Sequence, residues 1–153
     1  MALAVQTYSF ENVAAVLSGP GAPAIPIGVE AAVADEGITV AMEEDKDLMT
    51  GGADGSGMHT LRAGNRAKLT VRLLLTSPIN GFLALAYNFQ RGSSVNWGQN
   101  TLVITDFARG DLINASQVAF GKFPDLTYSK DGAMREWVFH AIQCKQLLSF
   151  IPG

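Results

Sequence analysis

Residues 67–91 read AKLTVRLLLTSPINGFLALAYNFQR, and the spacing of the apolar side chains changes in the middle of this stretch. Over residues 67–75 apolar and polar side chains alternate, which is typical of a β-strand with one buried face. The apolar set is Leu69, Val71 and Leu73, and the outward set is Lys68, Thr70 and Arg72. The first part of the stretch therefore predicts an amphipathic strand.

A helix is predicted directly after this strand. Ser77 can cap its N-terminus, Pro78 suits the first helical position, and Gly92 is a natural stop. We therefore predict one α-helix over about residues 77–91. The side chains that share its expected core face at helical spacing are Ile79, Phe82, Leu83, Ala86 and Phe89.

The N-terminal third carries further strand patterns. Residues 8–17 are rich in β-formers and end at a glycine–proline turn. Three prolines follow at positions 20, 23 and 26, which favours an extended segment at a sheet edge. A second strand is predicted over residues 38–43. We expect Ile38, Val40 and Met42 to face the core, and Thr39, Ala41 and Glu43 to face away from it.

The C-terminal third predicts three more strands. Residues 100–107 and 112–123 flank a turn at Arg109-Gly110. Asp131-Gly132 is a hairpin signal that predicts pairing of residues 126–129 with residues 134–142. Alternation in the last strand places Trp137 and Phe139 in the core.

These elements predict a mainly β fold in a single domain spanning residues 1–153. We expect an antiparallel two-sheet β-sandwich, or a partly open barrel, with one flanking α-helix. Apolar residues make up 48% of the chain and charged residues 16%, against about 25% charged in an average chain. This composition is typical of a protein that hides surface in an assembly, although a compact domain with a plain surface has the same composition.

Several functional classes are disfavoured. The net charge of −3 argues against a nucleic-acid-binding patch. The single cysteine, Cys144, excludes an intramolecular disulfide. Residues 1–8 lack the pattern of a signal peptide, and no stretch approaches the ~20 apolar residues of a membrane span.

Catalytic and metal-binding patterns are also missing. His59 and His140 are the two histidines, and neither has further ligands at the spacing of a zinc site. The glycine-rich residues 51–57 lack the Gly-Lys-Ser/Thr ending of a phosphate-binding loop and the glutamate that ends a calcium-binding loop. We therefore expect no enzyme, no cofactor and no metal.

Charge is segregated along the sequence. Seven of the fourteen acidic residues lie between Asp35 and Asp54, whereas the stretch from Gly55 to Thr105 has five basic residues and no acidic one. Within the acidic part, residues 44–58 hold four glycines, which predicts a long mobile loop or the tip of a hairpin. The two charged segments can pair within one subunit, which is the simpler explanation, or between subunits in a head-to-tail contact.

Three blocks of the sequence resemble a known family. They are residues 36–64 (EGITVAMEEDKDLMTGGADGSGMHTLRAG), 69–90 (LTVRLLLTSPINGFLALAYNFQ) and 117–142 (QVAFGKFPDLTYSKDGAMREWVFHAI). On these blocks the chain resembles the tail tube proteins of long-tailed, especially contractile-tailed, bacteriophages. The same fold is shared by the inner tubes of contractile injection systems.

The resemblance implies a structural virion protein made in the host bacterial cytoplasm. It implies hexameric rings that stack into a helical tube, through which genomic DNA passes without specific binding. Further partners would be sheath, baseplate or tail-tip, and tail terminator proteins. The loop at residues 44–58 would be an arm that reaches an adjacent ring or subunit. The predicted contact residues are Glu44, Asp45, Lys46, Asp47, Asp54, Arg62 and Arg66, and the predicted lumen-facing residues are Thr39, Glu43, Lys68 and Arg72.

Two alternatives stay open at this point. One is the inner-tube subunit of a contractile secretion or toxin-delivery machine, whose cargo is protein. The other is a monomeric β-sandwich that binds a carbohydrate or a peptide. A size measurement separates the second, because a binding module stays near its 16.2 kDa chain mass.

Overall fold

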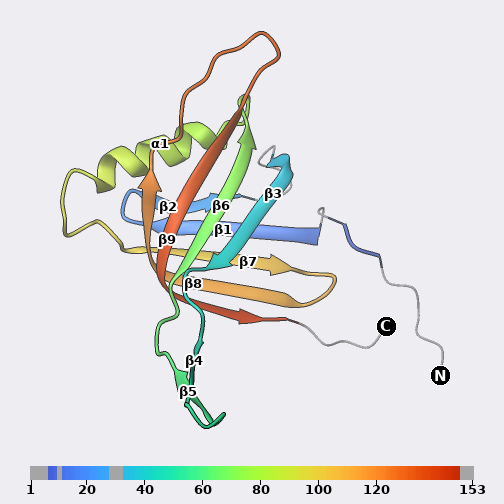
Figure 1. Cartoon of the computed structure of the whole chain (residues 1–153). Helices are drawn as coiled ribbons and strands as arrows, with labels where there is room; N and C mark the ends of the chain where they lie inside the picture. The colour runs from blue at the N-terminus through green and yellow to red at the C-terminus, as the bar shows by residue number, and fades with distance from the viewer. Residues whose placement is uncertain (1–6, 10–11, 28–32, 149–153) are drawn as a thin grey trace.

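The computed structural model describes residues 7–9, 12–27 and 33–148 (Figure 1). Most of the N-terminal segment in which no signal peptide was expected lies outside these residues. In chain order the elements are β1 (Val13–Gly19), β2 (Ala22–Pro26), β3 (Val33–Met42), β4 (Asp47–Gly51), β5 (Gly57–Leu61), β6 (Ala67–Leu74), α1 (Ile79–Gln90), β7 (Asn100–Asp106), β8 (Asp111–Lys122) and β9 (Met134–Leu147).

Seven of the strands form one antiparallel sheet in the order β2-β1-β7-β8-β9-β6-β3. The sheet does not close, because β2 and β3 are its two free edges. It folds over so that β3, β6 and β9 cross the direction of β1, β2 and β7 (Figure 1). The predicted mainly β, antiparallel, partly open architecture with one flanking helix is confirmed, and its two layers are halves of one continuous sheet.

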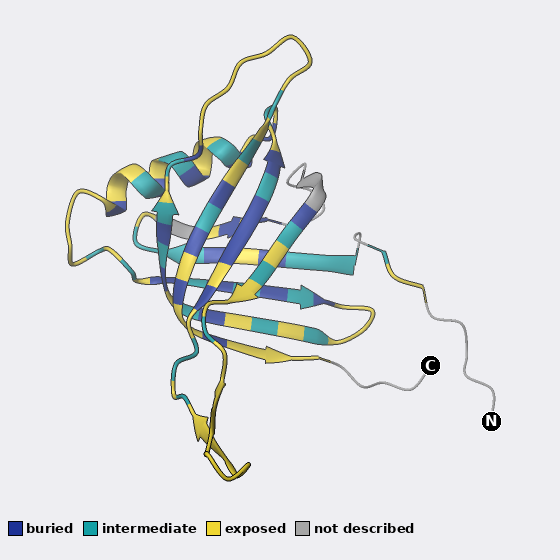
Figure 2. Ribbon diagram, viewed as in Figure 1, coloured by how far each residue is buried: buried dark blue, intermediate teal, exposed yellow. Residues whose placement is uncertain are grey.

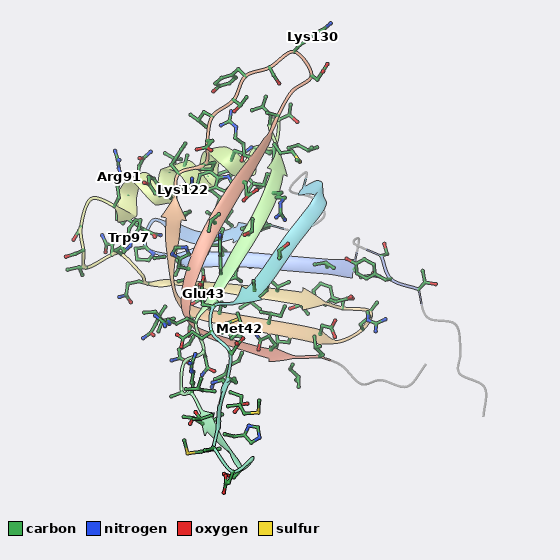
Figure 3. All side chains as sticks on the ribbon, in the orientation of Figure 1. Met42, Glu43, Arg91, Trp97, Lys122 and Lys130 are labelled. Carbon is green, nitrogen blue, oxygen red and sulfur yellow. The ribbon has the colours of Figure 1, made fainter. Side chains whose placement is uncertain are left out.

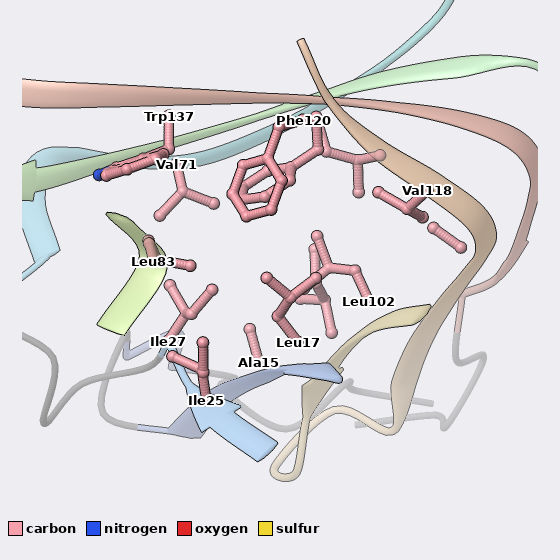
Figure 4. Close-up of a cluster of buried hydrophobic side chains, with 14 of the residues drawn as sticks. Ala15, Leu17, Ile25, Ile27, Val71, Leu83, Leu102, Val118, Phe120 and Trp137 are labelled. Atoms are coloured by element: carbon pink, nitrogen blue, oxygen red, sulfur yellow. The ribbon is translucent and has the colours of Figure 1, made fainter. Parts of the chain in front are cut away.

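The core fills the space between these two halves (Figure 4). Trp137, Phe120 and Phe139 enter it from β8 and β9, and Leu17 enters it from β1. Helix α1 closes one open end through buried side chains on its inner face (Figure 2). The predicted core residues Leu69, Val71, Leu73, Trp137 and Phe139 are all buried.

Two irregular positions in β8 lie where the sheet bends over itself. The ladder between β7 and β8 shifts by one residue between the pairs Asn100↔Val118 and Leu102↔Ala115. Gln117 sits in this bulge with a φ of 53°, a left-handed conformation that is uncommon outside glycine. A second shift against β9 falls at Gly121, where an added Cβ would lie 3.1 Å from a Val138 methyl carbon. Such bulges bend the strand that carries them.

A buried amide pair joins the helix to the sheet. Gln90 and Asn100 are both fully buried, and each side-chain amide donates to the other's oxygen at 2.7 Å. The same two amides also donate to the carbonyls of Pro20 and Val118. The end of α1 is thereby tied to the β1–β2 turn, to β7 and to β8, with each of these donors satisfied.

The helix differs in detail from the prediction. It starts at Ile79, and Ser77 lies outside it, where its Oγ accepts from the Ile79 amide at 3.3 Å. Phe82 and Phe89 were expected in the core but are each 56% exposed. Because α1 lies at the rim of the core, only a narrow stripe of it is covered, namely Ile79, Leu83, Ala86 and Gln90.

Two strand predictions were also wrong, and a third holds with a difference in exposure. Met42 is 42% exposed because β3 runs past the core at this end, although Ile38 and Val40 do pack against it. Thr70 shares the outward face with Lys68 and Arg72, as predicted, but it is only 7% exposed because Thr39 of β3 and Val138 of β9 lie on either side of it. Residues 126–129 form no strand, since they extend beyond the sheet and have no neighbouring strand to pair with.

The bulge in β8 predicts an unusual response to a strand-forming residue. Gln117→Val should lower the free energy of unfolding by about 1–2 kcal/mol, because a β-branched side chain clashes with the backbone at positive φ. The control is Lys145→Val, at an exposed β9 position opposite Asn114, which should change stability little. Urea unfolding of both variants measures the difference, and equal values would contradict a structural role for this bulge.

Candidate functional site

A two-stranded hairpin projects from one end of the folded sheet (Figure 1). It consists of β4 and β5, paired from Asp47↔Leu61 to Gly51↔Gly57, and we call residues 47–61 the arm. Every residue of both strands is exposed (Figure 2). At its tip Asp54 accepts hydrogen bonds from the hydroxyl and the amide of Ser56, and these bonds lower the pKa of the Asp54 carboxyl.

The arm exposes large apolar side chains. Leu48, Met49, Met58 and Leu61 have exposed fractions of 45%, 70%, 59% and 84%. The register places Leu48 and Met58 on one face and Met49 and Leu61 on the other. An isolated two-stranded hairpin is marginally stable in water. A surface that buries the apolar side chains of the arm would therefore stabilise it.

Several predicted contact residues meet at the base of the arm, within one chain. Arg66 forms an ion pair with Glu44. The Lys46 amine donates to the Arg62 carbonyl at 3.1 Å, and the Arg62 amide donates to the Lys46 carbonyl at 2.8 Å. The Glu44–Arg66 ion pair thus forms within the subunit, whereas the contacts of Lys46 and Arg62 involve backbone groups and leave their role between subunits a prediction.

The remaining acids are placed differently. Asp47 lies 3.0 Å from the Nδ1 of His59 across the arm, and Asp54 is held by Ser56. Asp45 is exposed and has no ion-pair partner in the described part of the chain. Asp45 and Asp54 are therefore the predicted contact residues that keep a carboxylate without a basic partner here, and their role between subunits remains a prediction.

The predicted lumen residues lie on one outward face of β3 and β6. Arg72 donates to the Thr39 hydroxyl at 3.1 Å and lies 3.6 Å from the Glu136 carboxylate. Lys68 is exposed opposite Ala41, and Glu43 is exposed just beyond the end of β3 (Figure 3). The structure therefore gives Arg72 a partner on β9, Glu136.

Sequence reasoning did not assign Glu136 to this face. The signal was available, because Trp137 and Phe139 alternate with Glu136, Val138 and His140 along β9. The β6–β9 register places Arg72 opposite Glu136 and Lys68 opposite His140. The outward face of β3, β6 and β9 thus carries both signs of charge.

Other chemistry is sparse in this molecule. Among the described residues, no three histidine, cysteine or acidic side chains come together as a metal site. Cys144 is buried, and burial raises the pKa of its thiol, which keeps it protonated and unreactive. In the described ranges, no helix has the length and apolarity needed to cross a membrane.

Comparison with known proteins decides the family. The sequence matches the family described as Bacteriophage PhiTE tail tube protein over residues 5–149. The chain belongs to this phage tail tube family. The resemblance seen in the three sequence blocks is confirmed, and the protein has a structural role in a phage tail tube. A search of curated proteins returned no match.

Solved structures share the fold of this tail tube protein. The tail of an empty GTA particle, determined with C6 symmetry, is similar with a TM-score of 0.60 and 11% identity, over 94% of this chain and 100% of that one. The cap that terminates the tube of the anti-feeding prophage is similar with a TM-score of 0.58 and 9% identity, over 97% of this chain and 95% of that one. A chain of the sheath–tube complex of the PVC extracellular contractile injection system is similar with a TM-score of 0.56 and 12% identity, over 93% of this chain and 92% of that one. At sequence identities this low, the similarity to these structures shows a shared fold only.

The base of the arm predicts a local effect on dynamics. Arg66→Gln removes the ion pair with Glu44 and should speed amide exchange over residues 47–61. Global stability should change by less than about 1 kcal/mol, because the pair is solvent-accessible. Hydrogen exchange on the free subunit measures this, with Arg91→Gln, at the far end of the molecule, as the control. Unchanged exchange in the arm would show that the pair does not position it.

Proposed function

We propose that this tail tube protein closes into rings of six subunits, which stack into the hollow tube that delivers the genome into the host. The observation that carries the proposal is the family match over residues 5–149. The C6 symmetry of the GTA tail, whose fold is similar, supports the ring of six. In this proposal the whole chain is one tube domain with a projecting arm, it resides in the virion tail, and it is made in the host cytoplasm.

The free surfaces of the subunit suit such an assembly. Strand β3 is an open sheet edge, whose unpaired backbone groups can be satisfied by a neighbour. The arm projects from one end with its apolar residues uncovered. Contacts of this kind join unlike surfaces of successive copies, and such contacts close into rings or extend into filaments.

We assign the tube lumen to the outward face of β3 and β6, which carries Thr39, Glu43, Lys68 and Arg72. Mixed charge supports this assignment, because each net basic contact to phosphate would strengthen binding through counterion release. Arg72 already has Glu136 beside it, and Glu43 supplies a carboxylate at the strand end that has no ion-pair partner among the described residues. Genomic DNA would pass such a wall without being held. Sheath, baseplate and terminator proteins are the further partners that the proposal includes.

A second candidate function is the inner tube of a toxin-delivery machine. It is favoured by similar folds in the anti-feeding prophage and in the PVC extracellular contractile injection system. The two functions differ in cargo. Particles that carry this protein and contain packaged DNA support the genome conduit, whereas particles that contain protein and no DNA support toxin delivery.

The proposal predicts the size of the purified protein. It should form rings or tubes of many subunits rather than remain at its chain mass of 16.2 kDa. Light scattering and negative-stain electron microscopy measure this, and averaged end views should show six-fold symmetry. A chain that stays monomeric at every concentration tested would instead support the monomeric binding module.

The lumen assignment predicts a charge effect on ejection. Glu43→Lys should allow tubes to form but slow genome release, since a basic wall binds phosphate. Raising the salt concentration should relieve the defect by screening the contact. DNA release from phage particles in vitro measures the rate, with Asp111→Lys, a charge reversal at the far β7–β8 turn, as control. Equal rates for both variants would place Glu43 away from the lumen.

A further inference from the structure

His140 adds a titratable side chain to the face that we assign to the lumen. It lies on β9 directly opposite Lys68 of β6, and its side chain is exposed. On the other side of β9 its register partner is Ala119 of β8, which carries no charge. Among the described residues His140 has no ion-pair partner. Its imidazole is therefore available to an anion that passes along this face.

A hollow at the root of the arm brings further charges to His140. Its lining includes Glu43, Glu44, Arg66 and His140. The charged groups that face the imidazole are thus the carboxylates of Glu43 and Glu44 and the cations of Arg66 and Lys68, with Glu44 and Arg66 paired to each other. These four charges cancel. A neutral imidazole leaves the group without net charge, and a protonated imidazole makes it positive.

The rest of the face is balanced in the same way. Among the described side chains, the charged groups on or beside the outward face of β3, β6, β9 and the end of β8 are three bases (Lys68, Arg72 and Lys122) and three acids (Glu43, Asp125 and Glu136). They are also mixed in space, because Arg72 lies 3.6 Å from Glu136, and Lys122 and Asp125 line one hollow with Glu136. The wall therefore has no net charge while His140 is neutral.

Protonation of His140 disturbs this balance. Histidine is the side chain whose charge ordinarily changes between about pH 5 and about pH 8. Each protonated His140 adds one positive charge to the wall, and the proposed ring repeats that charge in every subunit. Both ring nitrogens of an imidazolium carry a hydrogen and can donate to phosphate oxygens. Each net basic contact to DNA strengthens binding through counterion release.

We propose that His140 is a lumen residue that couples the passage of DNA to pH. Neutral imidazoles let the genome move along the balanced wall, and protonated imidazoles hold its phosphates. The coupling has a definite sign, because the added charge is present at acidic pH and is lost as the pH rises. This inference rests on the proposed genome conduit and on the lumen assignment.

Release of DNA from phage particles in vitro, measured at about pH 8 and about pH 5.5, tests the coupling. Wild-type particles should release DNA several-fold more slowly at the acidic pH, and added salt should reduce the difference. His140→Gln keeps a polar side chain that does not titrate, so it should release DNA at one rate at both pH values. His140→Lys keeps a positive charge at both pH values and should be slow at both.

The second histidine of the chain provides the matched control. His59 lies on the arm, 3.0 Å from Asp47. His59→Gln removes a titratable ring from the arm, and the wild-type pH dependence should remain. Carboxylates contribute little to the comparison, because most of them stay ionised above about pH 5. Negative-stain electron microscopy of each variant checks that tubes are intact, which we expect for His140→Gln because the side chain is exposed.

The outcomes separate this inference from the proposed function. A pH effect that is absent in wild-type particles, persists in His140→Gln or disappears in His59→Gln overturns the coupling and leaves the genome conduit intact. A His140→Gln chain that no longer forms tubes also overturns it, since His140 would then be a contact between subunits. A wild-type chain that forms no ring or tube contradicts the proposed function itself.

Discussion

The structure depends on the need of a single open sheet to bury its one apolar face. A flat sheet of seven strands would leave that face in water, and one 12-residue helix is too small to cover it. Folding the sheet over itself solves the problem, because β6 and β9 then cover β1 and β7. The bulges at Gln117 and Gly121 permit the bend, and α1 fills the end that the bend leaves open. The buried amides of Gln90 and Asn100 fix the helix in that place.

Much of this fold could be predicted from side-chain periods. Alternation in residues 67–75 and 134–142 identified buried faces correctly for Leu69, Val71, Trp137 and Phe139. A period shows which side chains share a face but does not show how much of that face is covered. Phe82 and Phe89 were misplaced for this reason, since an apolar side chain that awaits a partner looks like a core residue in the sequence. The bend of the sheet could not be predicted, because Gln117 is an ordinary residue in a strand pattern.

The functional site could be predicted from the sequence to about the same extent as the fold. Glycine content and charge segregation located the projecting segment, and the structure shows a hairpin there. Local pairing was harder to foresee, because register decides it: Arg66 meets Glu44, and Arg72 meets Glu136. Which surfaces meet between subunits depends on an assembly that a single chain does not contain. For that reason the contact residues remain predictions, whereas the family and its fold are established.

The proline-containing edge strand β2 limits how the free subunit can aggregate. The Ile27 amide bonds Ala15 of β1 at 2.7 Å, so the two-residue period of a strand turns the nitrogen of Pro26 toward the open side. That nitrogen carries no hydrogen, and it interrupts any ladder that another strand would form there. Fibrous aggregation by edge-to-edge addition needs a pairing surface on both sides of every copy. Within the described seven-stranded sheet, β3 is the edge without a proline, so addition of one such sheet to the next meets a terminating side at β2 instead of a growing one.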